Sequence, residues 1–269
     1  MPTVKAGAIN ISYDIFGSGE PLLLIMGFGA PGIAWMPVLP MLSNFKCIYF
    51  DNRGTGNSDK PAGAYTIRDM ADDADNLLGA LGIDSAMVYG ISMGGMIAQE
   101  LALRHPGRVS RMVLGCTTTG GPASVPPDEE TVAALATAFQ LMSTDPERAI
   151  DIMLPVVHPP DFIEAHPEVK QVALMGAAMM PPTPPDVIQR TLEGITQFNS
   201  YDRLPQVKCP VLIVHGERDI LLKPKNAEVL KSRLPQAEVY MIPNAGHNFF
   251  AENPLAVHQR IIEFLKASV

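Results

Sequence analysis

The order of apolar and polar segments is the feature that most restricts the fold of this 269-residue chain. Short, nearly continuous apolar runs, typical of strands covered on both faces, alternate with longer segments of helical periodicity. This alternation predicts an α/β fold, with a mostly parallel twisted sheet and helices on both faces. The predicted strands cover 21–27, 47–51, 86–90, 111–116, 209–216 and 237–243. The predicted helices cover 66–82, 95–106, 225–235 and 254–268, after an antiparallel edge hairpin within 6–21.

The alternation breaks between residues 119 and 202. This segment holds 12 of the 25 prolines, which predicts several short helices with proline stops. It also carries twelve acidic residues against three basic ones, so the whole acidic excess of the chain lies there. We therefore expect a core of residues 1–118 and 203–269, with residues 119–202 as an insertion.

Composition restricts the partners and the setting. The net charge of −8 and the pI near 5.2 argue against nucleic acid as a partner, because phosphate binding needs a basic face. No apolar run reaches the length of about 18 residues that a membrane span requires, and we expect no signal peptide. An odd number of cysteines, in or beside predicted strands, indicates buried thiols of a cytoplasmic protein. They are Cys47, Cys116 and Cys209.

A lone serine stands between a predicted strand and a predicted helix. The motif is Gly90-Ile91-Ser92-Met93-Gly94, and its glycines allow strand and helix to approach closely at a sharp turn. Ser92 is then held in a strained conformation above the sheet, beside the positive end of the helix. This setting predicts a nucleophilic serine. The alternative is an ordinary glycine-rich turn.

A nucleophilic serine needs a base and a carboxylate that orients the base. Asp219 follows the strand at 209–216, and His247 follows the strand at 237–243. The carboxyl ends of parallel strands meet at one edge of a sheet, so we predict Ser92, His247 and Asp219 as a catalytic triad. Glu217 is the weaker candidate for the acid. The remaining histidines are interpreted as structural or peripheral: His105, His158, His166, His215 and His258.

The reaction of an ester also needs donors for the oxyanion. The glycine-rich loop Met-Gly-Phe-Gly-Ala-Pro-Gly follows the first predicted parallel strand, at residues 26–32. We predict the backbone N–H of Phe28 as one donor and that of Met93, directly after the nucleophile, as the other.

These motifs together resemble the α/β-hydrolase fold family, over nearly the whole chain outside the insertion. The loop 51–61, DNRGTGNSDKP, matches the family's Asp-x-Arg-Gly-x-Gly-x-Ser loop. Segments 65–84, 95–114 and 209–219 resemble the branch of 3-oxoadipate enol-lactonases, small carboxylesterases, non-haem haloperoxidases and carbon–carbon bond hydrolases. The resemblance implies the same triad, and it implies that the insertion is a helical cap over the active site.

One departure from the family lies beside the oxyanion loop. The family usually has His-Gly where this chain has Met26-Gly27. Because the donor is backbone, the oxyanion hole is expected to survive, but a thioether cannot reproduce the hydrogen bonds of an imidazole. The change resembles a subset with methylesterase and related activities. Trp35, which follows this loop, is read as core packing, with pocket lining as the alternative.

The insertion supplies apolar side chains and few cations. Flexible methionines adapt to varied apolar ligands. An anionic substrate such as 3-oxoadipate enol-lactone would need a cationic partner for its carboxylate. We therefore expect neutral, rather apolar esters or lactones as substrates, including acyl-chain lactones, with no metal or cofactor. The candidate pocket residues are Trp35, Phe139, Met142, Met153, Met175 and Met179.

Three other functions stay open on the sequence. A carbon–carbon bond hydrolase carries the same triad, and a perhydrolase or haloperoxidase-like enzyme needs only peroxide in place of water. A slow-turnover ligand receptor of the same fold also retains the triad. The oligomeric state is not predicted.

Overall fold

The computed structural model describes residues 1–178 and 183–267. Its strands are β1 (Thr3–Ala6), β2 (Ile9–Phe16), β3 (Pro21–Ile25), β4 (Lys46–Phe50), β5 (Ala86–Ile91), β6 (Val109–Gly115), β7 (Val211–Gly216) and β8 (Glu238–Ile242). They form one eight-stranded sheet in the order β1-β2-β4-β3-β5-β6-β7-β8. The β1–β2 and β2–β4 pairs are antiparallel, and the other neighbours are parallel. The predicted α/β fold with a mostly parallel sheet is confirmed.

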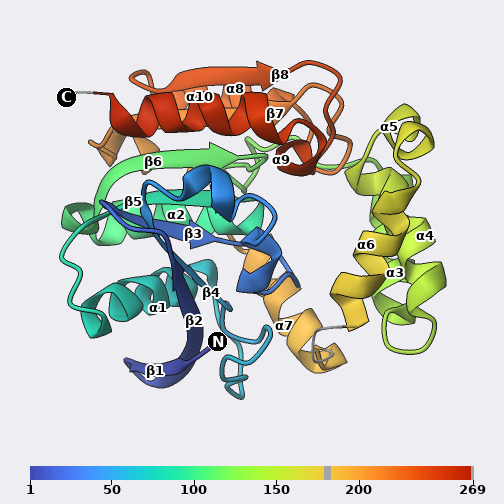
Figure 1. Cartoon of the computed structure of the whole chain (residues 1–269), viewed down its shortest axis with the longest axis horizontal. Coiled ribbons are helices and arrows are strands. Elements are labelled where there is room, and N and C mark those ends of the chain that lie inside the picture. The colour runs from blue at the N-terminus through green and yellow to red at the C-terminus, as the bar shows by residue number, and fades with distance from the viewer. Residues whose placement is uncertain (179–182, 268–269) are drawn as a thin grey trace.

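Helices cover both faces of the sheet (Figure 1). One face is covered by α1 (Ile67–Ala80), α2 (Met93–Arg104) and α8 (Lys225–Arg233). The other is covered by the 3-10 turns η1 (Gly32–Trp35) and η2 (Leu39–Leu42), with α9 (Phe249–Glu252) and α10 (Pro254–Lys266). A further 3-10 turn, η3 (Pro106–Arg108), follows α2, and η4 (Leu204–Gln206) precedes β7.

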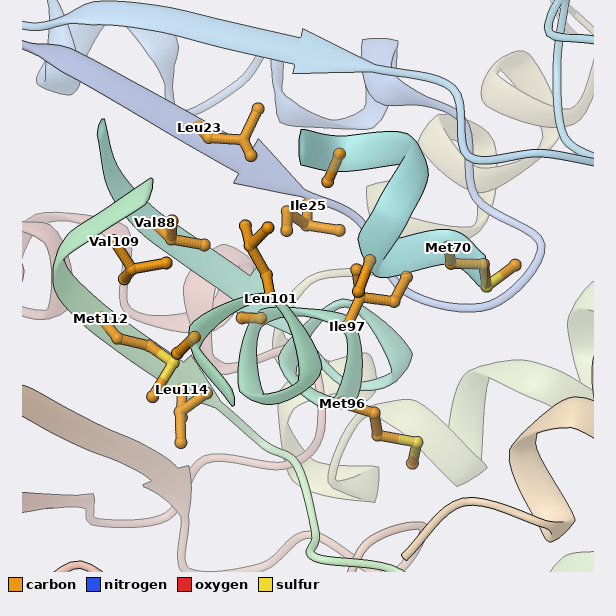
Figure 2. Close-up of a cluster of buried hydrophobic side chains, with 14 of the residues drawn as sticks. Leu23, Ile25, Met70, Val88, Met96, Ile97, Leu101, Val109, Met112 and Leu114 are labelled. Atoms are coloured by element: carbon orange, nitrogen blue, oxygen red, sulfur yellow. The ribbon is translucent and has the colours of Figure 1, made fainter. Parts of the chain in front are cut away.

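The central strands are apolar throughout because they are buried on both faces. In β3, Leu23 and Ile25 join the core under α1 and α2, whereas Leu22 and Leu24 join the core under α10. Figure 2 shows Leu23, Ile25 and Val88 of β3 and β5 in the same cluster as Ile97 and Leu101 of α2. This double burial explains why these strands read as continuous apolar runs.

In the described part of the segment between β6 and β7 there are five helices. They are α3 (Glu129–Leu141), α4 (Pro146–Val157), α5 (Pro160–Ala165), α6 (Glu168–Ala178) and α7 (Pro185–Thr196). Proline stands in the first turn of α4, α5 and α7, where its missing N–H costs nothing. The prolines of this segment therefore separate short helices, as expected from the sequence. Figure 1 shows α3 to α6 grouped to one side of the sheet.

Three expectations need correction. The N-terminal hairpin pairs β1 with β2 and turns at Gly7, whose φ of +60° suits glycine, so it begins before residue 6 and ends before residue 21. The short helix α9 was not predicted, because one turn carries too little periodicity. Cys47 and Cys116 are buried, but Cys209 is half-buried since it precedes the start of β7. Within residues 1–178 and 183–267, no helix has the length and apolar character needed to cross a membrane.

The crossing of α2 over β3 leaves no room for a side chain at Gly94. A Cβ there would lie 2.1 Å from the backbone oxygen of Ile25, whereas a Cβ at Gly107 would have nothing within 4 Å. We expect Gly94→Ala to lower the free energy of unfolding by about 1–3 kcal/mol, the usual cost of overpacking. Gly107→Ala should stay within about 0.5 kcal/mol of wild type. Urea denaturation measures both, and equal stability of the two variants would contradict the close approach.

Candidate active site

Ser92 sits at the turn that the sequence predicted. It separates the end of β5 at Ile91 from the start of α2 at Met93, with φ 57° and ψ −120°. A positive φ with this ψ lies outside the regions that residues with a side chain usually adopt, so the backbone is strained at Ser92. The backbone N–H of Ser92 donates to the carbonyl of Gly115 at 2.9 Å, and a Cβ on Gly27 would lie 3.2 Å from the Ser92 Cβ. The loop after β3 therefore lies directly against Ser92.

The structure also brings Asp219 and His247 together. Asp219 Oδ2 lies 2.8 Å from Nδ1 of His247, and both side chains are buried. The other carboxylate oxygen, Oδ1, accepts the backbone N–H groups of Leu221 and Leu222, each at 2.9 Å. A carboxylate held in this way keeps the proton of His247 on Nδ1 and leaves Nε2 as the basic nitrogen.

The pair shifts the pKa of both members in opposite directions. Burial on its own would raise the pKa of Asp219, but the charge of His247 and hydrogen bonds from His215 and His247 hold it well below its usual range. Burial would lower the pKa of His247, but the charge and hydrogen bond of Asp219 raise it well above its ordinary value. The pair therefore favours a charged carboxylate beside an imidazole that accepts protons readily.

His215 is the core histidine that the sequence suggested, but it also belongs to this group. It is fully buried in β7, and its Nε2 lies 2.6 Å from the carbonyl oxygen of Leu222 and 3.3 Å from Asp219 Oδ2. His215 thus helps to fix the carboxylate and the loop that follows it.

Cys116 is a site neighbour that sequence reasoning missed. It follows β6 with φ 37°, and its Sγ lies 3.8 Å from Nε2 of His247. Burial raises the pKa of this thiol, so it is a neutral neighbour of the imidazole at neutral pH. Its position in the sequence could have identified it, because Cys116 follows a parallel strand. Ser92, Asp219 and His247 likewise follow β5, β7 and β8.

Cys116, Asp219 and His247 each offer one potential metal-ligand atom, and these atoms lie within 4.8 Å of one another. Asp219 already accepts a hydrogen bond from Nδ1–H of His247, which leaves one sulfur and one nitrogen as available ligand atoms. A structural zinc site uses four protein ligands and a catalytic one uses three. This group therefore fits proton transfer better than metal binding.

The predicted oxyanion donors lie on the two segments that flank Ser92. Met93 is buried in the first turn of α2, and Phe28 is half-buried in the loop after β3. The carbonyl oxygen of Met26 accepts a hydrogen bond from Nδ2 of Asn52 at 3.0 Å. An amide from the 51–61 loop therefore holds the backbone of this loop at Met26, where the family usually has histidine.

The predicted pocket residues differ in their burial and in their contacts. The ring of Phe139 packs edge-on against Phe28 at 4.9 Å, so α3 reaches the loop after β3. Trp35 is fully buried against Tyr89 at 4.8 Å, as core packing predicts. Met142 and Met153 are half-buried, and Met179 lies outside the described residues. Met175 is 59% exposed on α6, so the structure does not support its place in an enclosed pocket.

The competing acid and histidines have other partners than Ser92 in the residues that the structure describes. Glu217 is exposed, and its N–H donates to Ile242. Four histidines bind other partners: His105 contacts Asp72, His166 contacts Glu168, His258 contacts the Pro254 carbonyl, and His158 contacts Glu252.

A cleft of about 370 Å³ opens between the end of α4 and the loops of Asp219 and His247. Its lining comes from residues 155–160, 217–220 and 246.

Known proteins are similar to this chain in sequence or in structure. RutD from Caulobacter sp. (strain K31), provisionally named a carbamate hydrolase, is 28% identical over 252 residues, 91% of this chain and 90% of RutD. The enol-lactonase from Burkholderia xenovorans LB400 is 25% identical with a TM-score of 0.85, over 99% of this chain and 100% of the enol-lactonase. A thermophilic esterase from Thermogutta terrifontis is 28% identical with a TM-score of 0.82, over 98% and 97% of the two chains.

The model of one family matches most of the chain. It describes the alpha/beta hydrolase fold, and it aligns with residues 20–254. The match includes the turn at Ser92, the Asp219 loop and the His247 loop. The chain therefore belongs to the alpha/beta hydrolase fold family.

Proposed function

We propose that this protein is a serine hydrolase that cleaves neutral, rather apolar carboxylic esters or lactones through an acyl-enzyme on Ser92. One observation carries the proposal: a serine with φ 57° at a strand–helix turn shares a fold with a buried aspartate–histidine pair joined at 2.8 Å. This combination suits general-base activation of a hydroxyl.

In the proposed mechanism, Nε2 of His247 takes the Ser92 proton while Oγ attacks the substrate carbonyl. Asp219 keeps the imidazole in the reactive tautomer and stabilises its cation. The N–H groups of Phe28 and Met93 stabilise the oxyanion. His247 then protonates the leaving alkoxide, and water activated by His247 releases the acid. This proton transfer requires contact between the Ser92 hydroxyl and Nε2 of His247, which also lies 3.8 Å from Sγ of Cys116.

The cations of the insertion support a neutral substrate. Lys170 pairs with Glu147 and Asp151, and Arg190 pairs with Asp186. Arg148 is exposed in the first turn of α4. A substrate carboxylate would have to compete with these acidic partners for a cation. The contact of Phe139 with the oxyanion loop adds an aromatic surface there.

The substrate class is tested by a pH-stat screen of neutral esters of graded acyl length beside neutral and carboxylated lactones. We expect turnover of the neutral compounds and loss of that turnover in Ser92→Ala. Turnover restricted to carboxylated lactones would contradict the substrate assignment. Saturable binding of apolar ligands without turnover would favour a receptor over an enzyme.

Activity should depend on pH through His247. The imidazole must be neutral to accept the serine proton, so activity falls as the pH drops through its pKa. Because Asp219 raises that pKa, we expect the acid limb of kcat/KM above the ordinary histidine value of about 6.5. A rate profile from pH 5 to 9 measures this limb. A profile that stays flat while chemistry limits the rate would contradict His247 as the base.

A further inference from the structure

The insertion is joined to the His247 loop by a buried pair of ionisable side chains, Glu252 and His158. Their exposed side-chain fractions are 3% and 6%, and Nδ1 of His158 lies 2.8 Å from Oε1 of Glu252. We propose that this pair is a positioning device, which holds the 246–248 loop and thereby aligns His247 for proton transfer. The inference rests on the proposed function of His247 and extends it to two residues with no place in the triad.

Glu252 binds the backbone of the 246–248 loop through its second carboxylate oxygen. Oε2 accepts the backbone N–H of Gly246 at 2.6 Å, directly before His247 in the chain. Glu252 belongs to α9, which follows the loop and packs with Phe249 into the core. The carboxylate therefore spans two donors, one on the His247 loop and one on the insertion.

His158 holds the same loop from the side of the insertion. Its Nε2 accepts a hydrogen bond from Nδ2 of Asn248 at 3.3 Å, directly after His247. A neutral imidazole with its proton on Nδ1 satisfies both this contact and the donation to Glu252. The ring stacks on Phe162 of α5 at 5.1 Å, which fixes its plane.

Backbone contacts complete the attachment. The N–H of Asn248 donates to the carbonyl of Val157, the last residue of α4, at 3.0 Å. A Cβ on Gly246 would lie 2.8 Å from Cδ of Pro159 and 3.0 Å from the Val157 oxygen. Both neighbours of His247 in the chain are thus held against the end of α4.

Loss of the Glu252 carboxylate is expected to lower the rate of the proposed reaction. Misplacement of a catalytic group by about 1 Å can cost about 10²-fold in rate. Loss of Glu252 should free the loop while the Asp219–His247 hydrogen bond and the substrate surface remain. The effect should therefore fall on kcat, with KM little changed.

The test compares Glu252→Gln with Glu263→Gln. The side chain of glutamine at position 252 has one acceptor oxygen for two donors, the Gly246 N–H and His158. The control residue Glu263 is exposed on α10 and contacts Gln259 of the same helix. We expect Glu252→Gln to lower kcat by about 10–100-fold with KM within about twofold, and Glu263→Gln to match wild type. Amide hydrogen exchange in residues 244–250, followed by mass spectrometry, should be faster in Glu252→Gln at unchanged rates elsewhere.

Two substitutions at His158 distinguish a role in positioning His247 from a role in the stability of the fold. His158→Gln keeps an N–H donor for Glu252 and should retain more of kcat than His158→Ala, at similar melting temperatures. A wild-type kcat and wild-type exchange in Glu252→Gln would overturn the proposal. A loss of kcat that only follows the fraction of unfolded protein would overturn it as well.

The failure of the proposed function would look different. In that case the wild type would hydrolyse no ester, or Ser92→Ala would retain turnover. The exchange measurement needs no activity, so faster exchange confined to residues 244–250 would still support the holding of the loop by Glu252, and unchanged exchange would still refute it.

Discussion

Ser92→Ala is expected to reduce ester turnover by about 10⁴-fold or more, because it removes the atom that forms the acyl-enzyme. In serine hydrolases, loss of the nucleophile costs about as much as loss of the whole triad, and the residual rate comes from the oxyanion hole and binding. Alanine removes one oxygen and leaves the backbone contact of Ser92 with Gly115 intact. The folded state should therefore be retained, and initial rates on the best neutral ester measure the change.

The matched control is Ser232→Ala. Ser232 is exposed on α8, and its hydroxyl bonds to the Val229 carbonyl of the same helix. This variant should match wild type in rate and in melting temperature. A Ser92→Ala protein that folds and keeps more than about a tenth of the activity would refute Ser92 as the nucleophile.

The second large effect is expected at Asp219. Asp219→Asn should lower kcat by about 10⁴-fold, because an amide nitrogen cannot accept the Nδ1 proton and His247 then adopts the wrong tautomer. The amide oxygen can still accept the backbone N–H groups of Leu221 and Leu222, so the loop should keep its conformation. Steady-state kinetics with intact folding by circular dichroism measure the loss.

Asp202→Asn is the control for that change, since Asp202 is exposed and lies outside the Asp219 loop. It should retain wild-type kcat. Activity of Asp219→Asn within about tenfold of wild type would contradict the assignment of Asp219 as the residue that orients the base.

The framework of the fold was predictable because burial on both faces leaves a strong pattern. Alternate residues of β3 serve opposite cores, so the strand appears as a continuous apolar run. The turn at Ser92 was predictable for a different reason. A side chain at position 90 or 94 would clash with neighbouring backbone, so glycine is required there. Asp219 and His247 could then be placed near Ser92, because the carboxyl ends of parallel strands meet at one edge of the sheet.

Contacts between distant segments were not predictable from local pattern. Cys116 looked like a buried thiol, and only the arrangement of β6 and β8 places its sulfur 3.8 Å from His247. His158 looked like one of two histidines in the insertion, yet it contacts Glu252, which is 94 residues away along the chain. The exposure of Met175 likewise depends on which face of α6 packs on its neighbours.

The central claim is that Ser92 is an activated nucleophile, and a covalent probe tests it most directly. The folded protein is treated with a fluorophosphonate ester, and the modified residue is located by peptide mass spectrometry. We expect one phosphonyl group, on the peptide that contains Ser92, with loss of esterase activity in the same proportion and no labelling of Ser92→Ala. Hydrolysis of esters by a protein whose Ser92 remains unmodified, or labelling that persists in Ser92→Ala, would contradict the claim.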